Sequence, residues 1–239
     1  MHLTVILPAY NEESRIEAGV DAVVAFLDTQ DIDGEVLVVN DGSTDRTGAL
    51  LHELAQRHPR LRAISLDANR GKGAAVRRGV DEARGDFILF TDVDQSTPIE
   101  EWLRLEERLQ QGHDVALASR EVVGAERVIP QPWMRRAMGY VFMTLRGWLV
   151  LPGFIDTQCG FKAFRRDIAK QVFSRALLDG FCFDVEILAI AVHLGHAVIE
   201  VPVRWRDDPR SSVDPLRDSI DMFGDLFTIR RNRARGLYD

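Results

Sequence analysis

The sequence predicts an α/β fold, in which one domain is built on a mostly parallel central sheet with helices on both faces. Short, continuously apolar segments alternate along the 239 residues with longer segments whose apolar residues recur at helical spacing. This order is typical of parallel strands that are joined by helical crossovers and covered on both faces. No internal repeat or linker-like segment divides the chain, so a single domain is expected.

The first half of the chain contains five short apolar segments, each bounded by polar residues, glycine or proline. We interpret them as buried strands at Leu3–Leu7, Glu35–Asn40, Leu61–Leu66, Asp86–Thr91 and Asp114–Ser119. Apolar stripes at helical spacing lie between them, in the segments around Ile16–Leu27, after Leu50 and over Gly71–Ala83. Ligands of such sheets collect at the carboxyl ends of the strands, so the residues that follow each strand are the candidate site.

The second half is less regular. We expect a long amphipathic helix over Pro132–Leu151, a strand near Thr157–Phe164 and a helix around Val185–His193. A strand at Ala197–Val203 and a final helix from Asp214 to Arg231 complete the chain. The long amphipathic helix has a broad apolar face flanked by arginines, a composition suited to a membrane interface; the face comprises Trp133, Met134, Ala137, Met138, Val141, Phe142, Leu145, Trp148 and Leu149.

Composition excludes several classes of protein. The formal net charge of −7 argues against a general nucleic-acid binder. Two cysteines, Cys159 and Cys182, are too few for a disulfide scaffold and lie outside zinc-site spacing, so a reducing cytosol is the expected compartment. The chain opens without a secretory signal pattern, and its longest apolar stretch, Val141–Phe154, is shorter than the roughly 20 residues of a membrane span. We therefore expect a protein that is soluble or lies on a membrane surface.

Polar residues follow the first two strands. Tyr10 offers a flat ring for stacking on a base, and Glu12 offers an acceptor for base or ribose hydroxyls, although acids also favour a helix N-terminus. Asp41 ends the second buried strand, so its carboxylate is either paired or awaiting a donor such as a ribose hydroxyl or a uracil N–H.

The segment after the third strand, Gly71-Lys72-Gly73, starts a helix and can bring backbone N–H groups and an ammonium near a phosphate. It lacks the glycine spacing and the Lys-Ser/Thr pair of a P-loop. Arg120 follows the fifth strand and either faces a phosphate or pairs with an acid such as Asp92; the first reading is favoured.

Asp92-Val93-Asp94, after the fourth strand, is the most informative motif. In extended backbone, residues i and i+2 point to the same face, so the two carboxylates converge and repel each other unless a cation lies between them. Hard oxygen ligands suit Mg²⁺ or Mn²⁺, completed by substrate phosphates. A solvated acidic turn before a helix starting at Thr97-Pro98 is the alternative.

Together, LTVILPAYNEE, VVNDGSTD, NRGKGAAVRRG, FTDVD and ASR resemble the family 2 glycosyltransferases, which have the GT-A fold and move a sugar from a nucleotide diphosphate to an acceptor. Within that family, DVDQSTPIEEW, DTQCGFKAF, GFCFDVEIL and VPVRWRDDPRSSVDPLRDSIDM are most similar to the synthases of polyprenyl-phosphate sugars, in particular the dolichyl-phosphate glucose synthases. The resemblance implies a GT-A domain over residues 1–213, with a nucleotide-sugar half (1–120) and an acceptor half (121–213), followed by an amphipathic helix and basic tail (214–239).

The resemblance also implies the roles of individual residues. Asp92 and Asp94 match the metal pair, and Arg120 matches an arginine of the phosphate region. The implied nucleotide-sugar-binding residues are Pro8, Ala9, Tyr10, Glu12, Asp41, Lys72, Asp92, Val93 and Asp94. Two departures from the family pattern stand out. Asn40 replaces the first acid of the usual Asp-Asp-Gly-Ser, and Arg210-Ser211-Ser212 replaces a Gly-Ser-Lys, so Arg204, Arg206 or Arg210 is expected to supply that cation.

The implied reaction is metal-dependent, inverting transfer of a hexose to a polyprenyl phosphate, with UDP-glucose preferred to GDP-mannose as donor. A phosphate monoester is mostly dianionic at pH 7 and needs no general base, so cations and polar groups should position it. The expected acceptor residues are Gln158, Lys162, Arg204 and Arg206. Asp92, Asp94, Arg120 and Asp156 form the expected catalytic set, in which Asp156 orients the acceptor, binds its counter-ion or acts as a base.

The expected location is cytoplasmic and peripheral, at the inner face of a membrane. Three other readings stay open at this point: a GDP-mannose-dependent mannose synthase, a module that binds nucleotide sugars without turnover, and a nucleotidyltransferase. The last leaves the DTQCGFK and VPVRWRDD segments without a role.

Overall fold

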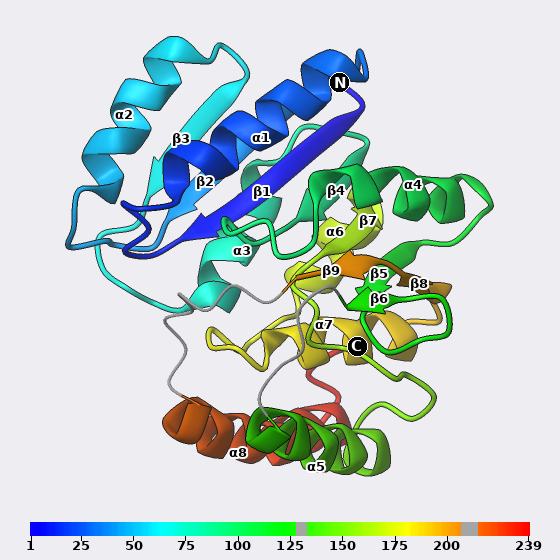
Figure 1. Ribbon diagram of the computed structural model, residues 1–239. Coiled ribbons are helices and arrows are strands. Elements are labelled where there is room, and N and C mark those ends of the chain that lie inside the picture. Colours follow the sequence, from blue (N-terminus) through cyan, green and yellow to red (C-terminus); the bar gives the residue numbers. More distant parts are fainter. Residues whose placement is uncertain (128–132, 207–214) are drawn as a thin grey trace.

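The computed structural model describes residues 1–127, 133–206 and 215–239 and contains a seven-stranded sheet in the order β3-β2-β1-β4-β7-β5-β8 (Figure 1). All neighbours pair in parallel except β7, which runs antiparallel to both β4 and β5. The predicted α/β class and mostly parallel sheet are therefore confirmed. The strands are β1 (Leu3–Ala9), β2 (Gly34–Asn40), β3 (Leu61–Ser65), β4 (Phe87–Phe90), β5 (Val115–Ser119), β7 (Lys162–Arg165) and β8 (Val198–Pro202).

Helices cover both faces of the sheet. Because side chains alternate along each strand, successive residues enter two separate apolar clusters, one on each face. In β2, for example, Val36 and Val38 face one cluster while Leu37 and Val39 face the other. The first cluster contains residues of α1 (Ile16–Thr29), α2 (Thr47–Arg57) and α4 (Trp102–Gln110), the last preceded by a 3₁₀ turn at Ile99–Glu101. The second contains residues of α3 (Lys72–Glu82), α6 (Arg166–Phe173) and α7 (Phe183–His193).

Two further helices, α5 (Trp133–Leu149) and α8 (Pro215–Ala234), lie side by side beyond α7 and form an outer layer (Figure 1). The rings of Phe142 and Phe223 lie 5.7 Å apart between them. No helix within the described ranges is long and apolar enough to cross a membrane.

The second half departs from the sequence prediction in its details. The strand expected at Thr157–Phe164 is shorter and later, because residues 155–161 form a loop before β7. The short helix α6 follows β7 directly and was not predicted. Two-residue strands β6 (Glu126–Arg127) and β9 (Arg204–Trp205) form a separate small pair. Since β7 is antiparallel, its first residues lie at the same edge of the sheet as the last residues of β4 and β5.

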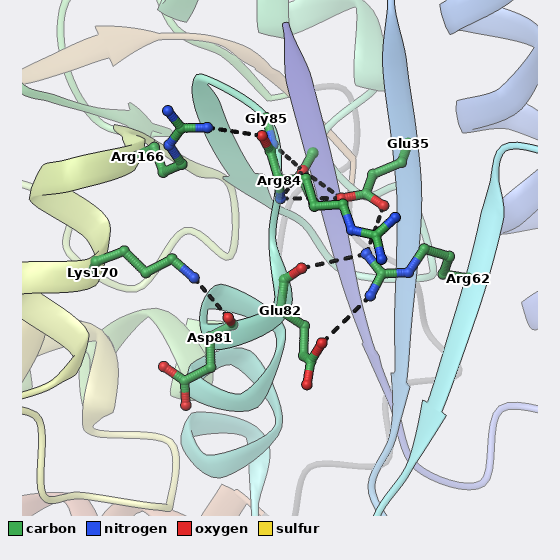
Figure 2. Close-up of polar contacts among 9 residues, drawn as sticks. Glu35, Arg62, Asp81, Glu82, Arg84, Gly85, Arg166 and Lys170 are labelled. Carbon is green, nitrogen blue, oxygen red and sulfur yellow. Dashed lines mark hydrogen bonds and ion pairs between the residues drawn. The ribbon is translucent and has the colours of Figure 1, made fainter. Parts of the chain in front are cut away.

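Positively charged side chains hold the C-terminal end of α3, which lies at the edge of the sheet opposite to the ends of β4 and β5 (Figure 2). Arg62 of β3 donates to the buried Glu35 carboxylate at 2.8 Å and to the Glu82 carbonyl oxygen at 3.3 Å. Lys170 of α6 donates to the Asp81 carbonyl oxygen at 2.7 Å. Positive side chains at a helix C-terminus satisfy free carbonyls and favour the helix dipole. This end of α3 is therefore anchored, while its other end reaches the candidate site.

Candidate active site

Four loops meet where β1, β2, β4 and β5 end, and the loop before β7 joins them because that strand is antiparallel. The motifs selected from the sequence are thus brought to one edge of the sheet. Pro8 and Ala9 are the last residues of β1, and the Ala9 carbonyl oxygen accepts a hydrogen bond from the backbone N–H of Asp41 at 2.8 Å.

The loops after β1 and β2 are fastened to each other. Asn11 has a left-handed backbone (φ 55°), which turns its side chain toward the second loop. Its N–H donates to the Ser43 hydroxyl at 3.0 Å, and its Oδ1 accepts from the Thr44 N–H at 2.9 Å. Tyr10 projects beside this junction with 41% of its surface exposed, so its ring is open to a stacking partner.

Glu12 belongs to a charged group that the sequence did not reveal. Both of its carboxylate oxygens accept hydrogen bonds from Arg15, each at 2.7 Å, and Nη1 of Arg15 lies 3.9 Å from Oδ2 of Asp94. Burial raises the pKa of Glu12 despite the Arg15 charge, with Asp94 and Asp92 adding to the increase. Arg15 therefore links the loop after β1 to the acidic pair after β4.

Asp41 is paired rather than awaiting a ligand. Its carboxylate accepts from the N–H groups of Arg70 and Gly71 at 2.9 and 2.8 Å and from Nδ2 of Asn69 at 3.1 Å. Asp41 thus holds the loop that begins α3 in the ligand-free fold, and its implied contact with a base or ribose stays a prediction. Of the two alternatives the sequence left open, the paired one is found.

Lys72, in the first turn of α3, reaches the acidic pair directly. Its Nζ lies 2.6 Å from Oδ1 of Asp92. Burial alone would lower the pKa of Lys72, but the Asp92 and Asp184 carboxylates more than offset this and raise it. Lys72 is therefore a firmly charged cation at the corner where a diphosphate is expected.

Asp92 and Asp94 lie on the same turn, with Val93 buried between them. Oδ1 of Asp94 accepts the Ser96 N–H at 2.9 Å, across a left-handed turn at Gln95 (φ 52°). Burial and the charge of Asp92 raise the pKa of Asp94, which shows that the two carboxylates repel each other. Two hard oxygen donors that share excess negative charge fit a divalent cation. No third His, Cys, Asp or Glu in the described ranges joins them as a ligand, so substrate oxygens would have to complete the coordination.

Gly160, just before β7, allows this corner to form. A Cβ atom at this position would lie 2.2 Å from Oδ2 of Asp92 and 3.0 Å from Nζ of Lys72. No side chain can occupy that space without displacing the carboxylate, so the glycine of DTQCGFK has a steric reason that only the fold reveals.

Replacing Gly160 with alanine should therefore move Asp92 and lower catalytic turnover by about 100-fold, the usual cost of displacing a reacting group by about 1 Å. Gly147→Ala is the matched control, because a Cβ there meets nothing within 4 Å. Steady-state rates of the two variants, with thermal unfolding as a check on folding, test this. Equal rates for both would contradict the steric argument.

Arg120 forms an ion pair, with Asp156 rather than with the suggested Asp92. Nε and Nη2 of Arg120 lie 2.7 and 2.9 Å from the two oxygens of Asp156, and the guanidinium lies 5.3 Å from the centre of the Trp205 ring. Although burial opposes it, the charge and hydrogen bonds of Arg120 lower the pKa of Asp156 to about 2. A carboxylate this acidic and fully paired is poorly suited to accept a proton near pH 7, so the geometry favours its orienting role over the base role.

Two of the expected acceptor residues are bonded to the elements that carry Asp94 and Asp156. The N–H of Arg206 donates to the Ser96 carbonyl oxygen at 2.9 Å, which places this exposed arginine next to the Asp94 turn. The backbone N–H of Gln158 donates to Oδ1 of Asp156 at 3.1 Å, and its Nε2 is a buried donor with no partner among the described residues. A buried unpaired donor is costly and is therefore a candidate for a bound oxygen.

The two other expected acceptor cations form ion pairs in the ligand-free fold, and their role toward the acceptor stays a prediction. Lys162 is fully buried, pairs with Asp184 and donates to the Cys159 carbonyl oxygen at 2.7 Å. Arg204 lies 2.6 Å from the carboxylate of Glu101. Both therefore hold the framework. Arg210, the third substitute considered, lies outside the described residues.

Comparisons with known proteins identify relatives across the whole length of the chain. Residues 4–173 match the family described as Glycosyl transferase family 2. The chain is 32% identical to a dolichyl-phosphate beta-glucosyltransferase of Dictyostelium discoideum, covering 100% of this chain and 76% of that protein. It is also 35% identical to the protein of that name in Drosophila melanogaster (96% and 74% covered) and 32% identical to that in Homo sapiens (99% and 77%).

The fold recurs among solved structures. The glucosyl-3-phosphoglycerate synthase of Mycobacterium tuberculosis, crystallised with Mn²⁺, UDP-glucose and phosphoglyceric acid, superimposes with a TM-score of 0.71 at 22% identity. The match covers 96% of this chain and 79% of that one. At this identity, the likeness establishes a shared fold.

Proposed function

Because the chain belongs to glycosyl transferase family 2 and has the expected GT-A fold, we propose that it transfers glucose from UDP-glucose to a dolichyl-type polyprenyl phosphate. The observation that carries this proposal is similarity over nearly the full chain, at 32–35% identity, to the three dolichyl-phosphate beta-glucosyltransferases compared above. In this proposal residues 1–120 supply the donor corner, and residues 121–213 supply the acceptor end.

The reaction joins an acceptor phosphate oxygen to the anomeric carbon of the donor sugar. The bond between that carbon and the diphosphate oxygen breaks, and UDP leaves with the electron pair, so attack from the opposite side inverts the anomeric centre. A dianionic phosphate monoester is itself the nucleophile and releases no proton. The low pKa of Asp156 agrees with this scheme, because an acceptor that carries no proton requires no general base.

Asp92 and Asp94 would hold Mg²⁺ or Mn²⁺ in the donor corner. The bound ion would stabilise negative charge on the departing diphosphate. The ammonium of Lys72 would stabilise the same negative charge, because it lies 2.6 Å from Asp92. Arg15 holds Glu12 and neighbours Asp94, and this keeps the acidic turn in place when the donor enters.

The acceptor phosphate would be met by Arg206 and the free Nε2 of Gln158. Both residues are attached to elements that also hold catalytic side chains, Arg206 through Ser96 and Gln158 through Asp156. Asp156 fixes Arg120, whose guanidinium then presents a constant positive charge between the donor corner and the loop before β7. Positioning of two anionic substrates is the main requirement of such a reaction.

The lipid acceptor requires a membrane surface, and we place the protein at its inner face, where nucleotide sugars are available. The outer layer of α5 and α8 exposes large apolar side chains: Val141, Leu145, Trp148 and Phe227. The first three lie at i, i+4 and i+7 and so share one face of α5. Exposed arginines at the end of α8 (Arg230, Arg231, Arg233 and Arg235) would attract anionic lipid. Trp133, Met134, Ala137 and Met138 of the expected apolar face lie outside the residues whose side chains are described.

Replacing Trp148 with glutamate should weaken binding to anionic vesicles by at least about tenfold. Trp148 is 85% exposed, so the change leaves the core intact. Val123→Glu is the control, since Val123 is fully exposed and belongs to the loop between β5 and β6 rather than to α5 or α8. Co-sedimentation at low and high salt measures the effect. If the parent protein does not bind anionic vesicles at low salt, the proposed membrane association is wrong.

The proposal is tested by incubating the purified protein with Mn²⁺, a short polyprenyl phosphate and labelled UDP-glucose or GDP-mannose. Label extracted into the organic phase only from UDP-glucose is the expected result. Label from GDP-mannose alone would replace the donor assignment. Nucleotide binding without any lipid product would overturn the enzymatic proposal in favour of a binding module.

A further inference from the structure

The loop between α6 and α7 (residues 174–182) packs against the N-terminus of α3. The carbonyl oxygen of Asp179 accepts from the N–H groups of Gly73 and Ala74, at 2.8 and 3.3 Å. The approach is so close that a Cβ at Gly71 would lie 2.4 Å from the same oxygen, and one at Gly73 would lie 2.7 Å from the Leu178 carbonyl oxygen. The first turn of α3, which carries Lys72, therefore packs directly against residues 178–179.

Arg77 of α3 contacts this loop by donating to the Ala176 carbonyl oxygen at 3.1 Å and by pairing with Asp179, and a buried carboxylate holds the loop from the other side. Oε2 of Glu186, in the first turn of α7, accepts from the backbone N–H groups of Leu177 and Leu178, at 3.0 and 2.8 Å. Its Oε1 accepts from the hydroxyl of Tyr238 at 2.8 Å. Nδ2 of Asn232 on α8 approaches the same hydroxyl at 3.4 Å.

Tyr238 is suited to this task. The residue is fully buried, and burial together with the Glu186 charge raises the pKa of its hydroxyl, which therefore keeps its proton and donates at neutral pH. Burial of Glu186 without this donor and the two amides would leave a carboxylate uncompensated. The bond thus joins the segment after α8 to the loop beneath α3.

We propose that Tyr238 and Glu186 are positioning residues for the donor: through residues 177–179 they hold the first turn of α3, and with it Lys72 beside Asp92. The proposal rests on the proposed function in one respect, namely that Lys72 meets the donor diphosphate. It adds that Tyr238, just after α8, is connected to the donor corner through Glu186, the backbone of residues 177–179, the first turn of α3 and the Lys72–Asp92 ion pair.

Tyr238→Phe keeps the buried ring and removes only the hydroxyl. Without its donor, Glu186 holds the loop less firmly, so hydrogen–deuterium exchange should accelerate in residues 174–182 and in residues 70–76. We expect UDP affinity, measured by calorimetry with Mn²⁺, to fall by up to about tenfold, as for loss of one buried hydrogen bond. The donor KM should rise by a similar factor, and kcat should fall as well, because a displaced Lys72 stabilises the departing diphosphate less.

Two variants separate positioning from general destabilisation. Ile229→Val removes one buried methyl from α8 in the same apolar cluster without touching the hydrogen bonds, and it should leave exchange in residues 70–76 and UDP affinity as in the parent. Glu186→Gln can still accept from both amides and donate to the Tyr238 oxygen, so it should accelerate exchange in residues 70–76 less than Tyr238→Phe does.

Unchanged exchange in residues 70–76 and unchanged UDP affinity in Tyr238→Phe would overturn the proposal, as would an equal effect of Ile229→Val. Exchange decides the positioning role even in protein that binds no UDP, whereas failure of the parent to bind UDP counts against the proposed function.

Discussion

Replacing Asp94 with asparagine is expected to reduce glucosyl transfer by at least about 100-fold while leaving the protein folded. The substitution preserves shape but removes one of the two charges that would hold the divalent ion. Burial and the neighbouring Asp92 raise the pKa of Asp94, so its charge is unfavourable in the ligand-free fold. Thermal unfolding without metal should therefore occur at the same temperature as in the parent, or slightly higher.

Thermal unfolding of the same variant also tests where the metal binds. Mn²⁺ should raise the unfolding temperature of the parent in the presence of UDP and should fail to do so in Asp94→Asn, because ligands that bind only the folded state stabilise it. Asp167→Asn is the matched control, since the Asp167 side chain is 96% exposed. Chelation with EDTA should abolish transfer by the parent. Full activity of Asp94→Asn, or of chelated parent enzyme, would end the metal mechanism.

The acidic pair could be found in the sequence because it directly follows a continuously apolar strand, which places it at the carboxyl end of the sheet. The extended backbone assumed for the pair is not found, since β4 ends at Phe90 and the Gln95 N–H closes a turn on the Asp92 carbonyl oxygen at 3.2 Å. The β1, β2, β4 and β5 strands were predictable because each carries its own apolar pattern. Tyr10 followed from its position directly after β1, and Lys72 from its position at the start of α3.

The remaining parts of the site depend on partners that are distant in the chain. The sequence left open whether Asp41 is paired, and it favoured Lys162 as an acceptor cation; the fold pairs Asp41 with amides near residue 70 and Lys162 with Asp184. Arg15 and Gly160 were missed because nothing local distinguishes an arginine or glycine that will meet the acidic turn. The antiparallel course of β7, which brings Gly160 to that turn, is likewise a property of the whole sheet.

Asp156→Asn should destabilise the protein by about 3–5 kcal/mol, because it leaves the Arg120 guanidinium buried without its counter-charge. The parent pair has near-ideal geometry, with two side-chain contacts of 2.7 and 2.9 Å and a further bond from the Arg120 N–H at 2.9 Å. Asp28→Asn is the matched control: Asp28 contacts Arg60 at 2.9 Å but is 59% exposed, so its loss should cost less than about 1 kcal/mol. Urea unfolding at pH 6 measures both.

Lowering the pH should remove part of the difference in stability between the parent and Asp156→Asn. The pKa of Asp156 is lowered from 3.8 to about 2, since the Arg120 interactions outweigh the effect of burial. A carboxyl group whose pKa is lower in the folded state stabilises the fold fully above its unfolded pKa, and this contribution disappears as the pH falls through the folded value. The shift corresponds to about 2 kcal/mol in total, of which about 1 kcal/mol is lost by pH 3.

The stability gap between the parent and Asp156→Asn should therefore be narrower at pH 3 than at pH 6, whereas the gap for Asp28→Asn should hardly change. A gap that stays constant would show that Asp156 is not held ionised by Arg120. Transfer rates extend the argument to function. If Asp156 only orients Arg120, the Arg120→Met variant should lower the rate as much as Asp156→Asn does, and the rate of neither should show a new dependence on pH. A much larger loss in Asp156→Asn than in Arg120→Met would instead assign the carboxylate a direct part in the reaction.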